Sequence, residues 1–158
     1  MAESAGTQKL RGVVIDEVSL APASPEQESE RKVAVADLLK DNLFAPAGGP
    51  GGPYDLRIGL VDDRLQLDIT GEGYAQRHLL SLGPFRRLVR DYLAICQSYY
   101  EAIRHATPGQ IEAIDMGRRG LHNDGAALLR ERLEGKVATD LATARRLFTL
   151  LCALHWRG

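Results

Sequence analysis

An alternation of apolar and polar residues runs through residues 54–70 of this 158-residue chain and constrains the fold more than any other feature. Because successive side chains of a strand point to opposite faces, the pattern predicts two antiparallel strands joined by a turn at Asp62 and Asp63. The apolar face of this hairpin consists of Leu56, Ile58, Leu60, Leu65, Leu67 and Ile69. The other face is polar, so we expect a sheet that is solvated on one side and covered on the other.

Two further strands are expected beside the hairpin. Residues 12–20 begin with β-branched residues, which predicts an N-terminal strand, and a short strand is expected near residues 76–82. Residues 46–53 contain only Gly and Pro apart from Ala47, which predicts an irregular loop within one domain.

Helices are expected both before and after the hairpin in the chain. Ser24, Pro25 and Gln27 form a capping-box sequence, which predicts the start of a helix over residues 25–43. Residues 84–105 carry apolar side chains at steps of three and four, which is typical of a long amphipathic helix.

Two more helix starts follow. Thr107, Pro108 and Gln110 repeat the capping-box sequence, and Asp140 precedes a final helix whose apolar face includes His155. The helix that begins at Pro108 either continues through Gly117 and Gly120 or breaks there, since each glycine costs about 1 kcal/mol within a helix.

These elements predict an α+β fold in which a small antiparallel sheet is closed by an N-terminal helix and a C-terminal layer of three or four helices. We expect a flexible N-terminus over residues 1–9 and a single domain over residues 10–158.

The charge is divided unevenly along the chain. Residues 1–79 contain 8 Lys or Arg and 13 Asp or Glu, whereas residues 80–158 contain 12 and 8. Three arginine pairs, Arg86–Arg87, Arg118–Arg119 and Arg145–Arg146, lie in the second half. Either the two halves form ion pairs within the fold, or the arginines meet a small anion or an acidic protein partner. The net charge of −1 argues against nucleic-acid binding as a main function.

Other classes of function find little support in the sequence. There is no apolar run long enough to cross a membrane and no secretory signal, so we expect a cytoplasmic protein with no membrane partner. Cys96 and Cys152 are expected to be reduced thiols within apolar helical patterns. No cofactor motif and no metal-ligand spacing is present, so we expect no cofactor and no metal site.

The segment 114–125 is the part of the chain that could carry chemistry. In a continuous helix, Glu112, Asp115, Arg118, Arg119 and His122 share one face, whereas a break would bring backbone N–H groups to the same side chains. Arg118, Arg119, His122 and Asn123 are the candidate ligand-binding residues, and His122 and Asp115 are the catalytic candidates. The alternative is a solvated face with ion pairs at helical spacing.

Three stretches, residues 82–92, 106–125 and 143–158, resemble the uncharacterised protein family UPF0262, small bacterial proteins of unassigned activity. The resemblance extends over nearly the whole chain from about residue 12. It implies a bacterial cytoplasmic protein of one domain, and it carries no catalytic residues.

We therefore expect a non-enzymatic binding or regulatory module that self-associates as a homodimer through the helix over residues 84–105 and holds an Arg/His anion pocket. The alternative is an enzyme or sensor for a small phosphorylated or carboxylated ligand, in which Arg118 and Arg119 clamp the anion and His122 acts as acid or base.

Overall fold

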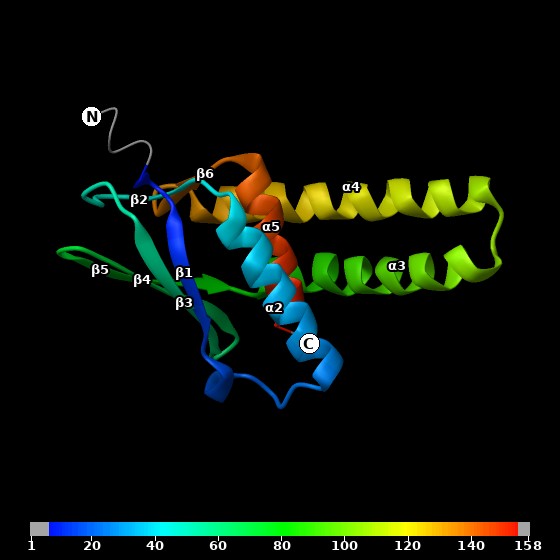
Figure 1. The fold of residues 1–158 in the computed structure, drawn as a ribbon, viewed down its shortest axis with the longest axis horizontal. Helices are drawn as coiled ribbons and strands as arrows, with labels where there is room; N and C mark the ends of the chain where they lie inside the picture. The colour runs from blue at the N-terminus through cyan, green and yellow to red at the C-terminus, as the bar shows by residue number, and fades with distance from the viewer. Residues whose placement is uncertain (1–6, 155–158) are drawn as a thin grey trace.

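The computed structural model describes residues 7–154 (Figure 1). Most of the segment expected to be a flexible N-terminus lies outside the described residues, and so does His155. Thr7 is tied to the body of the protein, because its hydroxyl donates a hydrogen bond to the carbonyl of Gly51.

The main sheet has four strands in the order β1 (Leu10–Ile15), β3 (Tyr54–Val61), β4 (Arg64–Gly71) and β5 (Tyr74–Ser81). The predicted hairpin and the short strand after it are confirmed, and both neighbouring pairs are antiparallel. The turn residues Asp62 and Asp63 have positive φ values of 48° and 63°, which match the right-handed twist of a tight hairpin.

The N-terminal strand differs from the predicted antiparallel arrangement, because β1 pairs with β3 in parallel. Helix α2 (Pro25–Lys40) lies between the two strands in the chain and returns it to the starting end of the sheet, as a parallel pair requires. A second sheet of two three-residue strands, β2 (Phe44–Pro46) and β6 (Val137–Thr139), was not predicted.

Helix α2 begins and ends through side-chain hydrogen bonds. The hydroxyl of Ser24 accepts from the backbone N–H of Gln27, whose side chain accepts from the backbone N–H of Ser24, so the predicted capping box is confirmed. The helix ends at Lys40, before the predicted residue 43, and the side chain of Asn42 donates to the carbonyl of Leu38 in the last turn.

Three helices form the C-terminal part: α3 (Arg86–His105), α4 (Pro108–Leu133) and α5 (Leu141–Ala153). Short 3-10 turns, η1 (Glu17–Ser19) and η2 (Gly83–Phe85), precede α2 and α3. Thr107 caps α4 with a capping box and Asp140 caps α5, as predicted.

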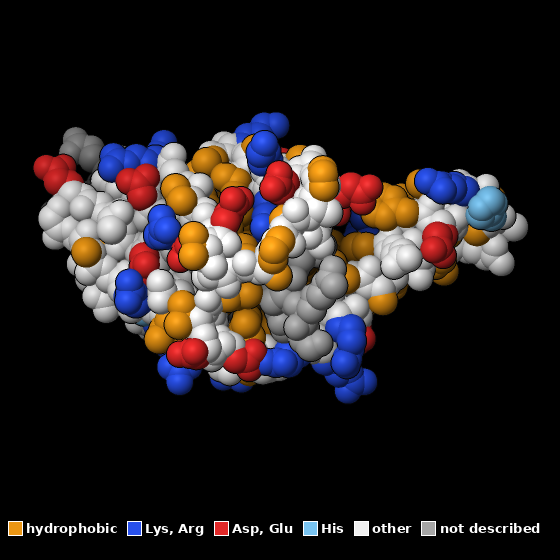
Figure 2. Space-filling model, turned by 90° about the horizontal axis from the view of Figure 1, so that it is seen from below, with side chains coloured by type: hydrophobic (Ala, Val, Ile, Leu, Met, Phe, Trp, Pro, Cys, Tyr) orange, Lys and Arg blue, Asp and Glu red, His pale blue; other side chains and the backbone are white. Residues whose placement is uncertain are grey.

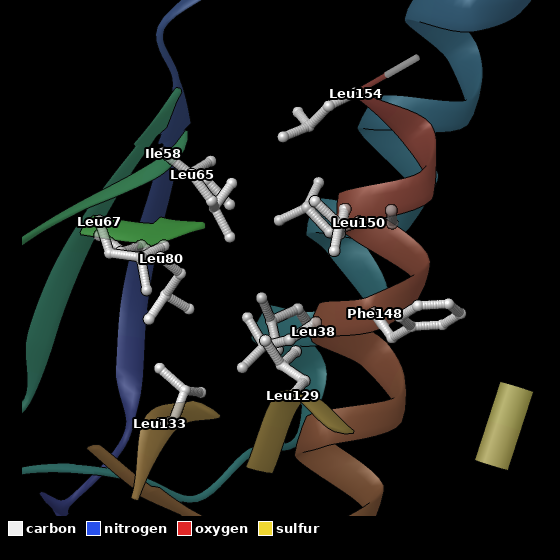
Figure 3. Close-up of a cluster of buried hydrophobic side chains, with 14 of the residues drawn as sticks. Leu38, Ile58, Leu65, Leu67, Leu80, Leu129, Leu133, Phe148, Leu150 and Leu154 are labelled. Carbon is white, nitrogen blue, oxygen red and sulfur yellow. The ribbon is translucent and has the colours of Figure 1, made fainter. Parts of the chain in front are cut away.

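The core lies between one face of the sheet and helices α2 and α5. Figure 3 shows Ile58, Leu65 and Leu80 of the sheet facing Leu38 of α2 and Leu150 of α5, and all five are at most 5% exposed. The opposite face of the sheet carries ion pairs, namely Arg11–Asp55, Arg57–Asp16 and Arg77–Asp68. The prediction of a sheet solvated on one side is therefore confirmed.

Helices α3 and α4 run antiparallel and project beyond α2 and α5 as a two-helix hairpin (Figure 1). We call residues 90–124 the α3–α4 arm. Figure 2 shows it extending from the body of the molecule, with hydrophobic side chains along its base and basic and histidine side chains at its far end.

Candidate functional site

Helix α4 continues through Gly117 and Gly120, which settles the question that the sequence left open. A Cβ atom at Gly117 would lie 2.8 Å from Cδ1 of Ile95, so this glycine allows α3 to approach closely. A Cβ atom at Gly120 would meet nothing within 4 Å. The unbroken helix places Asp115, Arg118 and His122 on one face, as one of the two sequence alternatives predicted.

Asp115 binds both arginines of the central pair. Its two oxygens lie 2.5 Å from Nη2 of Arg118 and 3.0 Å from Nη2 of Arg119. The hydrogen bond from Arg118, with the nearby charge of Arg119, lowers the pKa of the Asp115 carboxyl below its ordinary value. The guanidinium of Arg118 also lies 4.3 Å from the centroid of the Tyr99 ring, in a cation–π contact.

His122 faces α5, one turn further along α4. Its Nε2 lies 2.8 Å from the hydroxyl of Thr149, and that hydroxyl donates to the carbonyl of Arg145. In the tautomer that carries its proton on Nε2, the ring donates to Thr149, whose own hydrogen then points to the carbonyl of Arg145. Burial lowers the pKa of His122 below its ordinary value and outweighs the backbone hydrogen bond with Arg145, which raises it. The charges of Arg145 and Arg118 add to the lowering.

Asn123 pairs with a different partner. Its side-chain oxygen accepts a hydrogen bond of 2.8 Å from Nε of Arg145 on α5. The predicted site residues therefore form three neighbouring groups: the Asp115, Arg118 and Arg119 cluster, the His122–Thr149 pair and the Asn123–Arg145 pair.

Aromatic residues that the sequence analysis did not single out as site residues complete this region. The ring of Tyr92 lies 5.3 Å from that of His122 and 5.7 Å from that of Phe148. Tyr92 and Tyr99 belong to the apolar stripe of α3. They could have been found by pairing α3 and α4 as antiparallel helices, which brings the apolar stripe of α3 beside the face of α4 that carries Asp115 and His122.

The two thiols are poorly suited to nucleophilic chemistry. Burial raises the pKa of Cys96 and of Cys152, and neither thiol forms a disulfide. Among residues 7–154, no group of three or more His, Cys, Asp or Glu side chains could hold a metal ion. In the same range, no helix is both long and apolar enough to cross a membrane.

Chemically, the arrangement offers two guanidinium groups that share one carboxylate, with a neutral imidazole beside them. An anion can bind both arginines when it competes with Asp115. Nε2 of His122 is already engaged by the hydroxyl of Thr149, so the geometry favours a structural role for this imidazole over proton transfer.

Comparison with known proteins identifies relatives but no activity. The model of an uncharacterised protein family, UPF0262, matches residues 7–157. A UPF0262 protein of Phenylobacterium zucineum (strain HLK1) is 65% identical over 150 residues, covering 95% of this chain and 94% of the relative. A UPF0262 protein of Caulobacter vibrioides (strain NA1000 / CB15N) is 61% identical over 156 residues, covering 99% and 98%. No solved structure matches the chain.

Proposed function

The chain belongs to the uncharacterised protein family UPF0262, and from its fold we propose that it is a non-enzymatic binding or regulatory module that forms a homodimer through the α3–α4 arm. Helices α3 and α4 contribute to the core at one end and project beyond it over residues 90–124, and we assign this projecting part the role of an interaction surface.

The lack of a core within the α3–α4 arm carries this proposal. Within residues 90–124, all of which are described, Ala102 is the one residue that is buried. Helical hairpins gain their stability chiefly by burying an apolar face, and isolated helices are marginal in water. An arm of this length with so little buried surface is therefore stabilised when another surface covers it.

The exposed side chains of the arm include large hydrophobic groups. Tyr100 is 62% exposed, Ile103 is 51% exposed and Met116 is 62% exposed. Tyr100 and Ile103 extend the apolar stripe of α3 beyond Tyr92, whose ring contacts Phe148 of α5. Each exposed hydrophobic area favours association by about 25 cal/mol for every Å² that a partner removes from water.

A second copy of the chain is the occupant that we propose for this surface. The part of α3 in the arm is about 24 Å long and two packed helices are about 20 Å wide, so one face has a projected area of about 480 Å². This area corresponds to a small interface, since a standard one buries roughly 800 Å² per partner. The tip carries Arg104 and His105 beside Glu101 and Glu112, and the base carries Asp91 and Asp124 beside Arg90. Both ends of the arm are therefore of mixed charge, and antiparallel stacking would allow Arg104 of one copy to pair with Asp91 or Asp124 of the other.

The mass of the full chain in solution tests the proposal. We expect sedimentation equilibrium to show a dimer of the wild type, and a monomer when both Tyr100 and Ile103 are replaced by Glu. Val18→Glu is the matched control, because Val18 is 96% exposed and lies outside the arm in η1. A wild type that stays monomeric at the highest concentration, or an arm variant that dimerises as the wild type does, refutes the proposal.

The anion pocket is the second candidate, either as part of this module or as the site of an enzyme or sensor. The ion pairs that Arg118 and Arg119 both form with Asp115 support it. An incoming carboxylate or phosphate would take the place of the Asp115 carboxylate. We further propose that the module works in the cytoplasm, where the unpaired thiols of Cys96 and Cys152 stay reduced.

A further inference from the structure

A groove of about 610 Å³ lies between strand β1 and one face of helix α2. We call it the α2–β1 groove. Its apolar wall is formed by Val13 and Ile15 of β1 and by Val35 and Leu39 of α2. Arg31 of α2 lines the same groove, so one cation lies beside a hydrophobic surface.

Arg31 is almost entirely buried, with 4% of its surface exposed. Its Nε donates a hydrogen bond of 3.0 Å to the carbonyl of Ala153, and its Nη2 donates one of 2.9 Å to the carbonyl of Leu154. These carbonyls end helix α5, so the guanidinium caps the negative end of that helix. Among the described residues, no carboxylate forms an ion pair with Arg31.

The guanidinium has donors left over after this capping. A guanidinium has five N–H donors, and the two carbonyls use one on Nε and one on Nη2. Arg31 also lines the groove, so we assign its remaining donors to a ligand bound there. The end of helix α5 compensates about half of the positive charge of Arg31, and a bound anion would compensate the rest.

We propose that the α2–β1 groove binds a small aliphatic carboxylate. The carboxylate group accepts hydrogen bonds from Arg31, and the hydrocarbon chain lies against Val13, Ile15, Val35 and Leu39. The guanidinium fork matches a carboxylate in shape, and a groove of this volume lies within the range of roughly 300–1,000 Å³ that small-molecule sites occupy.

Three other charged groups face the groove, and all of them are exposed. Glu17 and Glu28 are unfavourable for an anion, whereas Lys32 is favourable. Water and salt screen exposed charges strongly, whereas a buried guanidinium is screened much less. Arg31 therefore determines the charge preference of the groove.

Thermal unfolding and titration calorimetry with sodium octanoate test this inference on the full chain. We expect octanoate to raise the melting temperature and octylammonium, which has the same chain length and the opposite charge, to leave it unchanged. Acetate, which has the head group alone, is expected to bind at least about tenfold more weakly than octanoate, because it buries no hydrocarbon chain.

Two glutamate variants of α2 separate the groove from the rest of the helix. Val35→Glu puts a negative charge on the groove wall and is expected to weaken octanoate binding by at least about tenfold. Val33→Glu is the matched control, because Val33 is 57% exposed and is not part of the groove wall, and it is expected to bind as the wild type does. Arg31→Lys keeps the charge but loses the fork, and a weaker affinity is expected.

The inference is overturned if the wild type does not respond to octanoate, if octanoate and octylammonium act equally, or if Val35→Glu binds like Val33→Glu. It is independent of the proposed dimer. The same titration on the Tyr100→Glu, Ile103→Glu variant is expected to give the wild-type affinity, whatever the oligomeric state.

Discussion

Gly125 of α4 lies directly against the ring of Phe148 of α5, and a Cβ atom at this position would overlap the ring. Phe148 is fully buried, so the ring has no free space into which it could move. This contact is where the arm joins the body, because Gly125 lies just beyond the arm and Phe148 belongs to the core.

Gly125→Ala is therefore expected to destabilise the protein by about 1–3 kcal/mol through overpacking. Gly120→Ala, in the same helix, is expected to stabilise it by about 0.5–1 kcal/mol, because alanine is the better helix former and its methyl group meets nothing. Urea unfolding of both variants, followed by circular dichroism, measures the difference. Equal effects of the two substitutions would contradict the contact with Phe148.

The Asp115 cluster predicts a dependence of stability on acid. Because the pKa of Asp115 is lower in the folded chain than its ordinary value of 3.8, the unfolded chain binds a proton first as the pH falls. The stabilisation is complete above that ordinary value and is lost as the pH falls through the folded pKa. Asp115→Asn is expected to be less stable than the wild type at neutral pH, and this difference should vanish in strong acid. A difference that does not change with pH would exclude the ion pairs as its cause.

His122 predicts a second dependence, in a higher range of pH. Burial lowers its pKa below the ordinary value of 6.5, so the unfolded chain takes up the proton first and stability falls as the pH drops below about 6.5. Above that value the imidazole is neutral in both states and contributes no slope. His122→Gln, which retains a donor for Thr149, should lose part of the slope.

His78 contributes a slope of the same sign, because burial and the charge of Lys136 lower its pKa as well. Residue-resolved NMR titration is therefore the measurement that checks His122. An imidazole of His122 that titrates at or above 6.5 would contradict its buried, neutral state.

The sequence predicted those parts of the fold that local chemistry determines. The alternation around Leu56 and Leu67 and the turn at Asp62 correctly predicted the hairpin, because a pleated strand has a period of two. The direction in which β1 pairs was not predictable in this way, since alternation shows which face is apolar and not which strand lies alongside. The three-residue strands β2 and β6 are too short to show a period at all.

In the candidate site, too, the sequence predicted what depends on local spacing but not what depends on packing. Spacing alone placed Asp115, Arg118 and His122 on one face of a helix. Which group each side chain meets depends on packing, and so the contacts of His122 with Thr149 and of Asn123 with Arg145 could not be derived before α5 was placed. The low helix propensity of glycine favoured a break at Gly117. In the fold, however, Ile95 of α3 packs closely against Gly117, which a larger residue at that position would prevent.

The anion pocket can be tested through the carboxylate that now occupies it. If Arg118 and Arg119 bind anions, Asp115→Asn should strengthen the response, because it frees two guanidinium groups from their partner. We expect citrate or pyrophosphate to raise the melting temperature of Asp115→Asn more than that of the wild type. The double variant Arg118→Ala, Arg119→Ala should show no response, whereas Arg104→Ala, which removes an exposed arginine at the end of α3, controls for net charge. Equal shifts in all of these proteins would show that anions act on the surface in general, and the two arginines would then be structural partners of Asp115 alone.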